Sequence, residues 1–175
     1  DIITEEQEKG TLHISPILIC TAGEYLDNIS RERAEKAFHC SVYTNYSCTE
    51  GGIIANECRY KHLHVNEDNI ILEAIDKDLN PVPPGTLSDG VLITNLSNKI
   101  SPIIRYRMSD QIIVHDEPCP CGNKSKWIEI NGRSGDILTF NRNGEPYKIG
   151  SLALFNCIYH LSSLRRFQII LHPNN

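Results

Sequence analysis

The sequence predicts an α/β fold, in which a strand and helix unit is followed by a small β subdomain. An apolar run over residues 12–20 ends at the turn-forming residues 21–24, and the charged stretch 30–38 has helical spacing. From Leu63 onward the chain instead shows short β-type runs separated by residues such as Pro, Gly and Asn. The first pattern indicates a βα unit, and the second indicates a compact region built mainly of strands.

The expected strands are short and bounded by turns. A strand over residues 42–46 should present the residues that follow it at its carboxyl end, where open α/β sheets usually bind ligands. Further strands are expected over residues 63–65, 70–76, 90–95, 112–115 and 126–130. Asn143-Gly144 predicts a hairpin. It would join strands at 137–140 and 147–149, ahead of a helix over 151–161 and a strand over 167–171.

The composition excludes several classes of function. The chain has 175 residues, of which 40% are hydrophobic and 22% charged, as in a globular protein with one sizeable core. Its 17 basic and 22 acidic residues give a net charge of -5, and the basic residues are scattered, so nucleic acid and anionic membranes are not expected partners. No apolar run approaches the roughly 20 residues of a membrane helix, and the acidic start does not resemble a signal peptide. We therefore expect a cytoplasmic protein, and the sequence does not indicate its oligomeric state.

Seven cysteines are present, an odd number that argues against a disulfide framework. Cys20, Cys40, Cys48 and Cys157 lie in or beside apolar runs, where a reduced cysteine packs as a small hydrophobic residue. No histidine lies near Cys48 in the sequence, so we expect it to pack rather than to act as a nucleophile.

The other three cysteines form a pattern typical of a metal site. Cys119-Pro-Cys121-Gly is a tight turn with two thiolates, and Cys58 is followed by two histidines, His62 and His64. Three thiolates and one of these imidazoles would complete a tetrahedral Cys3His set. Because four protein ligands close the coordination sphere, zinc bound there would be structural.

The segment from Tyr46 to Gly52 has the residue types that approach a phosphate and its metal ion. Its last four residues, Thr49-Glu50-Gly51-Gly52, are called the TEGG turn below. Glycine lets backbone amides come near a phosphate, and threonine and glutamate supply oxygen ligands. Alone, the segment is a modest signal, because such motifs also occur in ordinary turns.

Further motifs downstream indicate a function for this segment. Tyr46-x-x-Thr49-Glu50-Gly51-Gly52, residues 105–110 and residues 132–136 resemble, in order and spacing, three core motifs of the adenylate-forming ligase superfamily. Within it the chain resembles most the phenylacetate-coenzyme A ligase-like family. That family adds short motifs that are matched here by Glu57-Cys58, Leu63-His64, Glu67-Asp68, Pro83-Pro84-Gly85 and Cys119 to Gly122. The resemblance covers nearly the whole chain.

The resemblance implies a two-step reaction. A carboxylic acid attacks the α-phosphorus of ATP to give an acyl-adenylate and pyrophosphate, and the thiol of coenzyme A then displaces AMP. The expected substrate is an aromatic or related small-molecule carboxylate. In-line chemistry of this kind depends on positioning and on charge neutralisation more than on covalent help from the protein.

The resemblance also implies roles for individual residues. Tyr46 would stack on adenine, Thr49 would contact the α-phosphate and Glu50 would hold Mg²⁺. Asp110 matches the ribose-binding aspartate, whose carboxylate accepts hydrogen bonds from both ribose hydroxyls. The remaining nucleotide contacts are expected from Ala22, Gly23, Glu24 and Arg133.

The same resemblance supports the zinc site. The implied ligands are Cys58, His64, Cys119 and Cys121. His64 is preferred to His62 because it takes the Leu-His position of the family. Strand alternation would place the two imidazoles on the same face, so the choice between them stays open at this point.

The chain departs from the family pattern at three positions. Ser47 and Ser109 stand where the family usually has glycine, which bears on the close approach of the backbone to the nucleotide. Gly135 stands at the hinge position, where the family has an acidic residue, and Asp136 matches only the next position.

The resemblance also predicts how the chain is organised. Residues 1–133 are expected to form the later part of an AMP-binding N-terminal domain with its zinc-bearing β subdomain, and residues 134–175 the beginning of a mobile α+β C-terminal domain. The upstream phosphate loop and the C-terminal catalytic lysine of the family are not in this sequence. We therefore expect a piece of a longer protein that is inactive alone.

Two other functions remain open. The chain could be a non-catalytic β module, held together by zinc, that binds a protein partner. It could also belong to an adenylating enzyme that passes its acyl group to a carrier protein or an amine instead of coenzyme A.

Overall fold

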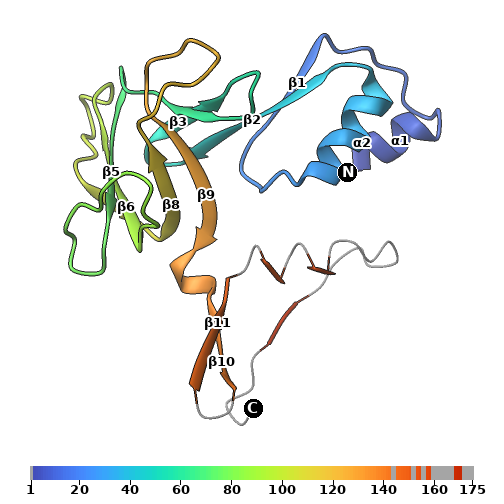
Figure 1. The fold of residues 1–175 in the computed structure, drawn as a ribbon. Helices are drawn as coiled ribbons and strands as arrows, with labels where there is room; N and C mark the ends of the chain where they lie inside the picture. Colours follow the sequence, from blue (N-terminus) through green and yellow to red (C-terminus); the bar gives the residue numbers. More distant parts are fainter. Residues whose placement is uncertain (1, 143–144, 151–152, 155–156, 159–167, 171–175) are drawn as a thin grey trace. The chain divides into compact units, whose positions relative to one another are not determined.

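The computed structural model describes residues 2–142, 145–150, 153–154, 157–158 and 168–170 (Figure 1). The chain divides into two compact units. The first contains Asp1–Leu72, Thr94–Ile104 and His115–Ile128, and the second contains Glu73–Ile93, Arg105–Val114 and Glu129–Asn175. The predicted boundary between residues 133 and 134 falls inside the second unit and stays a prediction. No helix among the described residues is long and apolar enough to cross a membrane.

Two helices lie at the start of the first unit and pack against each other. Helix α2 (Asn28–Phe38) confirms the helix predicted at 30–38, and it begins earlier because Asp27 caps it by accepting a hydrogen bond from the backbone amide of Ser30 at 2.9 Å. The helix ends at His39, which has a left-handed backbone conformation. Helix α1 (Ile2–Glu8) was not predicted from the acidic start.

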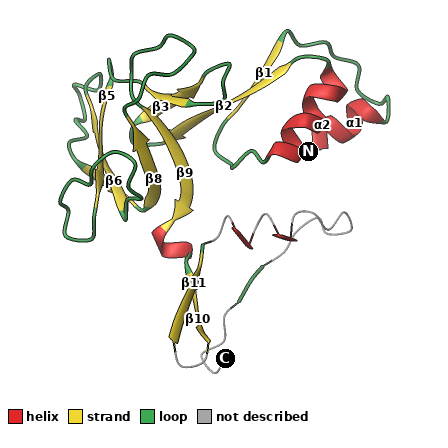
Figure 2. Cartoon of the chain, viewed as in Figure 1, coloured by secondary structure: helices red, strands yellow, loops and turns green. Residues whose placement is uncertain are grey.

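The sheet of the first unit has the strand order β1-β2-β3-β4-β9 (Figure 2). Strand β1 (Leu18–Thr21) runs parallel to β2 (Ser41–Cys48), and β2 turns back into the antiparallel β3 (Gly52–Glu57). Strand β4 (Leu63–Val65) pairs with β3 and with the first residues of β9 (Trp127–Arg133). The βα unit and the strands at 42–46 and 63–65 are thus confirmed, whereas β3 was not predicted.

The strand predicted at 12–20 is wrong over most of its length, because only Leu18–Thr21 is a strand. Pro16 has no backbone N–H to donate to a neighbouring strand, and the side chain of Ile17 is 96% exposed. The apolar residues before Leu18 therefore form a loop rather than part of the sheet.

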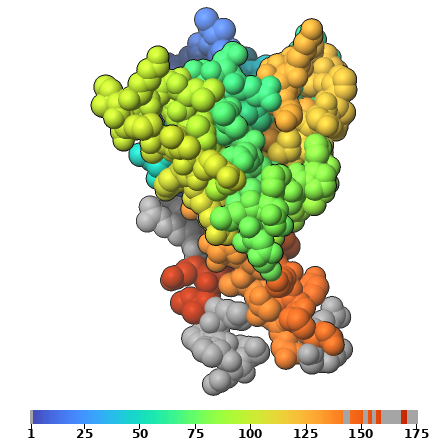
Figure 3. All heavy atoms as spheres, turned by 90° about the vertical axis from the view of Figure 1, so that its left-hand side faces the viewer, coloured from blue at the N-terminus to red at the C-terminus, as the bar shows by residue number. Residues whose placement is uncertain are grey.

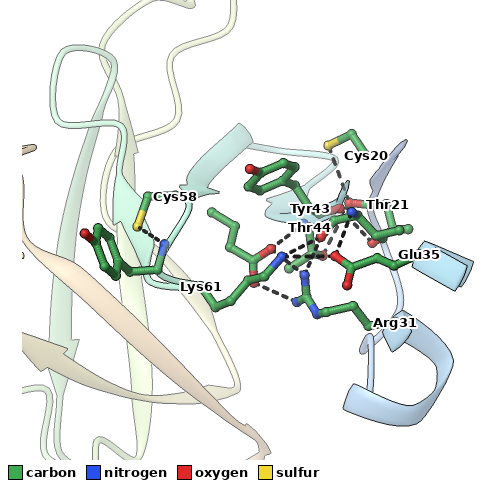
Figure 4. A network of polar contacts seen from close by, with 11 residues as sticks. Cys20, Thr21, Arg31, Glu35, Tyr43, Thr44, Cys58 and Lys61 are labelled. Atoms are coloured by element: carbon green, nitrogen blue, oxygen red, sulfur yellow. Dashed lines mark hydrogen bonds and ion pairs between the residues drawn. The ribbon is translucent and has the colours of Figure 1, made fainter. Parts of the chain in front are cut away.

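A buried ion pair joins α2 to the sheet. Both terminal nitrogens of Arg31 donate to the carboxylate of Glu57, at 2.8 and 2.7 Å, and one of them also donates to the carbonyl of Val42. Glu57 further accepts a hydrogen bond from the backbone amide of Thr44 at 3.0 Å. Figure 4 shows Arg31 among the polar groups that link the helix to β2 and to the segment around Cys58. The pair therefore fixes the end of β3, directly before Cys58.

A second sheet has three strands, in the order β5-β6-β7. Its strands are β5 (Ile70–Ile75), β6 (Gly90–Asn95) and β7 (Tyr106–Met108). A Cβ at Gly90 would lie 2.9 Å from the carbonyl oxygen of Met108, so this close strand contact requires glycine. The β5–β6 connection is largely exposed, and its atoms, in green, lie on the face turned to the viewer in the space-filling view (Figure 3). The strands predicted at 70–76 and 90–95 are confirmed.

The second unit also contains β8 (Asp110–His115) up to Val114, which neighbours β9 in the sheet. The buried side chains of the second unit come from several strands and include Ile75, Val91, Ile93 and Ile112. The hydroxyl of Ser88 is buried and accepts the backbone amide of Ile112 at 2.9 Å. The strands predicted at 112–115 and 126–130 are therefore confirmed, with each slightly longer than expected.

The C-terminal part begins with the short 3-10 helix η1 (Ser134–Asp136). Strands β10 (Leu138–Arg142) and β11 (Glu145–Ile149) then form the predicted antiparallel hairpin, whose turn residues 143–144 lie outside the described residues. Of the helix predicted at 151–161, residues 153–154 and 157–158 are helical and the others lie outside the described residues. Residues 168–170 of the predicted last strand are not in a strand, since no described strand pairs with them.

Candidate functional site

The TEGG turn closes the hairpin between β2 and β3. Cys48 pairs with Gly52 in the ladder, so the turn stands at the carboxyl end of β2 as the sequence predicted. Gly52 has a φ of 72°, which favours glycine, and the amide of Gly51 donates to Cys48 Sγ at 3.1 Å. The side chain of Thr49 is exposed and that of Glu50 is half-buried. The turn therefore presents a hydroxyl and a carboxylate at one strand end.

Asn95 holds this turn from a segment distant in the sequence. Its Nδ2 donates to the carbonyl of Gly51 at 3.1 Å. Its Oδ1 accepts the amides of Ser97 and Asn98 at 2.8 and 3.0 Å. The side chain therefore ties the end of β6 to the TEGG turn. Sequence reasoning missed this residue, and its only local signal is an asparagine at a strand end with Ser97 and Asn98 two and three positions after it.

The packing of Cys48 agrees with the prediction of a structural role. Its thiol is half-buried, and burial is the main cause that raises its pKa. A thiol with a raised pKa forms less thiolate and is a weaker nucleophile at neutral pH.

The other nucleotide contacts predicted in the first unit lie in β2 or directly after β1 of the same sheet. Ala22, Gly23 and Glu24 are exposed directly after β1, and Gly23 has a φ of 86°. Because β1 and β2 are parallel and Thr21 pairs with Thr44, their carboxyl ends point toward the same edge of the sheet. Tyr46 is only 8% exposed, so its ring offers little free surface to a base in this conformation. Its stacking role stays a prediction.

Two predicted nucleotide contacts lie together in the second unit. Arg133 Nε is 3.3 Å from Asp110 Oδ1, with Arg133 largely exposed and Asp110 mostly covered. Beside them, both the amide and the hydroxyl of Ser134 donate to the carbonyl of Ser109, at 2.8 and 3.1 Å. The hinge candidates Gly135 and Asp136 are exposed on η1. Ser109 thus serves a backbone contact that needs no glycine.

Four predicted metal ligands meet in the first unit. The ligand atoms of Cys58, His64, Cys119 and Cys121, called the cysteine cluster below, all lie within 4.8 Å of one another. The sulfurs of Cys58 and Cys119 are 3.8 Å apart, and Cys121 Sγ lies 3.3 Å from His64 Nε2. Zinc bound to two thiolates at about 2.3 Å with tetrahedral angles would place the sulfurs about 3.8 Å apart. The donor set and its spacing therefore fit zinc.

The orientation of His64 also suits a metal ligand. Its Nδ1 lies 3.0 Å from the carbonyl oxygen of Ser125. Because a carbonyl only accepts, Nδ1 is the donor in this hydrogen bond, and Nε2 is the ring nitrogen that faces the sulfur of Cys121. Metal-bound histidines commonly have such a carbonyl partner on the other ring nitrogen. The imidazole is buried, at 4% exposure, so this arrangement is firmly held.

Backbone amides support the cysteine cluster from both of its loops. The amide of Tyr60 donates to Cys58 Sγ at 3.4 Å, and the amide of Asn123 donates to Cys121 Sγ at 3.3 Å. The Asn123 amide is the main cause that lowers the pKa of Cys121. Burial raises the pKa of Cys119 to about 11. Gly122, which follows Cys121 and precedes Asn123, has a φ of 89°, a backbone conformation that favours glycine in this tight turn.

His62 lies beside the cysteine cluster but outside its four members. Its Nδ1 is 3.3 Å from Cys119 Sγ. Its ring stacks on Trp127, with centroids 3.9 Å apart and an interplanar angle of 8°. The geometry therefore favours His64 as the fourth ligand, as expected from the resemblance, and it gives His62 a different position.

Comparisons with known proteins agree with this architecture. No family model matches the chain. It is 27% identical to Protein CapK of Staphylococcus aureus over 76% of this chain and 28% of that protein. It is 33% identical to phenylacetate-coenzyme A ligase of Thermus thermophilus over 49% of this chain and 20% of that enzyme. The chain thus spans less than a third of each of these two relatives.

Solved structures have the same fold over most of the chain. The structure of an open conformation of 2-hydroxyisobutyryl-CoA ligase, in complex with 2-HIB-AMP and CoA, matches 91% of this chain and 39% of its own, with a TM-score of 0.73 and 21% identity. The anthranilate CoA ligase AuaEII, in complex with anthranoyl-AMP, matches 74% of this chain and 26% of its own, with a TM-score of 0.53 and 18% identity. The chain is therefore similar in sequence to part of a phenylacetate-coenzyme A ligase and has the α/β fold of the matching part of these CoA ligases.

Proposed function

We propose that this chain is part of an ATP-dependent ligase that activates a carboxylate as an acyl-adenylate. The observation that carries the proposal is the TEGG turn, held at the carboxyl end of β2 by Asn95 in a chain with the fold of the adenylate-forming ligases. A turn at this place lies where α/β sheets bind their ligands. Its hydroxyl and carboxylate provide the contacts that a phosphate and a divalent cation need.

In this proposal each part of the turn has a separate task. Thr49 would donate a hydrogen bond from its hydroxyl group to an α-phosphate oxygen, and its side chain is exposed and therefore accessible. Glu50 would hold Mg²⁺ through its carboxylate, which is the kind of ligand that this ion prefers. When bound, Mg²⁺ neutralises charge on the phosphates. The protein's own contribution is to fix the α-phosphorus for in-line attack by the carboxylate.

Asp110 and Arg133 would bind the nucleoside side of ATP. An ionised Asp110 accepts hydrogen bonds from both ribose hydroxyls. Its ion-pair partner Arg133 limits the directions in which the carboxylate can turn. In the first unit, Ala22, Gly23, Glu24 and Tyr46 would contact adenine and the acyl carboxylate. Gly135 and Asp136 would provide the hinge of the mobile domain.

For the second step we propose transfer of an aromatic acyl group to coenzyme A. The similarity to phenylacetate-coenzyme A ligase supports both parts of this proposal. A different acceptor, such as a carrier protein or an amine, is the second candidate.

The cysteine cluster would hold a structural zinc ion in the same protein. Its three sulfurs and one imidazole nitrogen fit a closed tetrahedral site, which leaves no open position for a substrate. Zinc would link the loop after β3 to the loop before β9. If the protein has no ligase activity, the alternative is a non-catalytic β module that zinc holds together and that binds a protein partner.

Carboxylate-dependent exchange of pyrophosphate with ATP tests the proposal. We expect the full-length protein to catalyse exchange with at least one aromatic acid, and to release AMP when coenzyme A is added. Glu50→Gln should lower the exchange rate about 100-fold, because it removes a charge that acts on the transition state. Glu32→Gln, at an exposed glutamate of the same unit, is the matched control and should leave the rate unchanged.

The outcomes separate the candidate functions. Exchange without coenzyme A-dependent release of AMP favours another acceptor. No exchange with any carboxylate, together with no uptake of ATP and Mg²⁺ in calorimetry, rejects the ligase proposal in favour of the zinc-bearing module. For the chain alone we expect no exchange, because the predicted phosphate loop and lysine are not in its sequence.

A further inference from the structure

His62 makes a polar contact with the cysteine cluster from outside its four members. Its Nδ1 is 3.3 Å from the sulfur of Cys119. Cys119 is 6% exposed, so water has little access to this sulfur. A zinc-bound thiolate keeps much of its negative charge and needs hydrogen-bond donors when it is shielded from water.

We propose that His62 donates its Nδ1–H to the thiolate of Cys119 and thereby strengthens zinc binding without being a zinc ligand. This inference rests on the zinc site proposed above. An N–H group pointing at a thiolate stabilises the charged form that binds the metal. His62 is thus a positioning residue of the site.

The fold holds His62 in the orientation that this role needs. The amide of Cys58 donates to the carbonyl of His62 at 2.9 Å, and the amide of Lys61 donates to the carbonyl of Cys58 at 2.8 Å. These bonds close the loop between β3 and β4, which carries both the ligand and the donor. Stacking on Trp127 then fixes the ring plane. A ring fixed from two sides loses little further freedom when it donates.

His115 provides an internal comparison for this role. It also stacks on Trp127, with centroids 3.8 Å apart and an interplanar angle of 6°. Two rings this close to one indole cannot share a face, so His62 and His115 lie on opposite faces of Trp127. The Nδ1 of His115 instead faces a carboxylate oxygen of Glu117 at 3.1 Å. The two histidines therefore share the stacking contact and differ in the contact with Cys119.

Competition for zinc between the chain and a chromogenic chelator tests the proposal. His62→Phe keeps a stacking ring and removes the donor, and we expect about 10- to 100-fold weaker zinc binding with the stoichiometry unchanged. His115→Phe makes the same ring exchange on the other face of Trp127 and should bind zinc as the wild type does. His62→Asn retains an N–H donor near the position of Nδ1 and should restore part of the affinity.

Two spectroscopic readouts accompany the competition experiment. Trp127 is the only tryptophan of the sequence, so its fluorescence reports whether each variant keeps the stack. Co²⁺ in place of zinc reports the ligand set and the charge on sulfur through its thiolate charge-transfer band. We expect His62→Phe to shift this band while the tetrahedral pattern with three sulfurs and one nitrogen remains.

Several results would overturn the proposal. Equal weakening by His62→Phe and His115→Phe would assign the effect to stacking, and unchanged binding in His62→Phe would leave no role for the donor. Loss of the nitrogen ligand in His62→Phe, with its retention in His64→Phe, would make His62 the ligand itself. A wild-type chain that binds no zinc would reject the metal site as a whole, which distinguishes that failure from a failure of His62 alone.

Discussion

Arg133 Nε lies 3.3 Å from Asp110 Oδ1, so two residues that the sequence assigned to the nucleotide form an ion pair with each other. Arg133 is 65% exposed, and an ion pair with such an exposed partner contributes little to stability. Asp110, at 14%, is held against the protein. The pair is therefore better suited to orienting a carboxylate than to stabilising the fold.

Asp110→Asn should weaken the binding of ATP to the full-length protein. The amide keeps the size of the side chain but loses charge-assisted hydrogen bonds to ribose, each worth about 1.5–3 kcal/mol. We expect the Kd for ATP to rise about 10-fold or more, measured by calorimetry. Asp116→Asn, at an exposed carboxylate, is the control. An unchanged Kd for Asp110→Asn would remove this residue from the nucleotide site.

Asn95→Asp should loosen the TEGG turn. Aspartate keeps the acceptor for Ser97 and Asn98 but has no N–H group to donate to the carbonyl of Gly51. We expect a loss of about 1 kcal/mol in the free energy of unfolding and faster amide hydrogen exchange in residues 48–52.

The control for this variant is Asn98→Asp. The Oδ1 of Asn98 accepts the amide of Ser101 at 3.1 Å, and aspartate retains that acceptor. Its unfolding free energy should stay close to that of the wild type. Equal exchange rates in the turn of both variants would mean that Asn95 does not hold it.

The cysteine cluster was predictable because cysteine and histidine at this sequence spacing are typical of a zinc site. Cys119-Pro-Cys121-Gly is a local motif, and His62 and His64 follow closely after Cys58. The choice of His64 over His62 needed more than spacing, since it depends on the pairing of β4 with β9 and on the carbonyl of Ser125. Tertiary contacts of this kind leave no periodic signal in a sequence.

The misses in the fold have equally specific reasons. The apolar residues before Leu18 suggested a longer strand, but Pro16 cannot donate to a ladder. Strand β3 follows the TEGG turn so closely that the glycines obscured its start at Gly52. Asn95 escaped notice because its partner Gly51 is far away in the sequence. Propensity and periodicity report on neighbours, whereas these features depend on contacts between distant segments.

Glu57→Ala should strongly destabilise the first unit. The substitution leaves Arg31 buried without its carboxylate partner, and both side chains of this pair are nearly covered, at 11% and 3% exposure. Removal of one partner from a buried pair typically costs about 3–5 kcal/mol. Urea unfolding monitored by the fluorescence of Trp127 measures this loss.

Glu8→Ala is the matched control for Glu57→Ala. Glu8 pairs with Arg33, but both side chains are more than a third exposed. Exposed pairs contribute about 0–1 kcal/mol. A loss for Glu57→Ala as small as that for Glu8→Ala would show that the buried pair does not secure α2 to the sheet.

Glu35 should make the stability of the chain depend on acid pH. The backbone amide of Val42, at 3.0 Å, is the main cause that lowers the pKa of Glu35 below its ordinary value of 4.5, and the charge of Lys61 adds to it. The unfolded chain therefore binds the proton more tightly than the folded chain. This contribution to stability is complete above the ordinary value and is lost as the pH falls through the folded pKa.

Unfolding free energies at about pH 7, 5 and 3.5 test this dependence. Glu35→Gln should lower stability at neutral pH and show a smaller further loss on acidification than the wild type. Glu32→Gln, at an exposed site on the same helix, should keep the wild-type profile. Parallel profiles for wild type and Glu35→Gln would contradict the assigned role of Glu35.

Removal of zinc should lower the Tm of the chain. A ligand that binds the folded state alone stabilises it by about 2.7 kcal/mol at a free concentration of 100 times its Kd. A strong chelator should therefore lower the Tm of the wild type measurably, and metal analysis before chelation should find one equivalent.

Cys121→Ser, which removes a cluster ligand, should have a low Tm with or without chelator. Cys20→Ser changes an exposed cysteine outside the cluster and should respond to the chelator as the wild type does. A wild-type Tm that the chelator leaves unchanged would mean that zinc does not stabilise this fold, because any ion bound to the folded state alone must raise the free energy of unfolding.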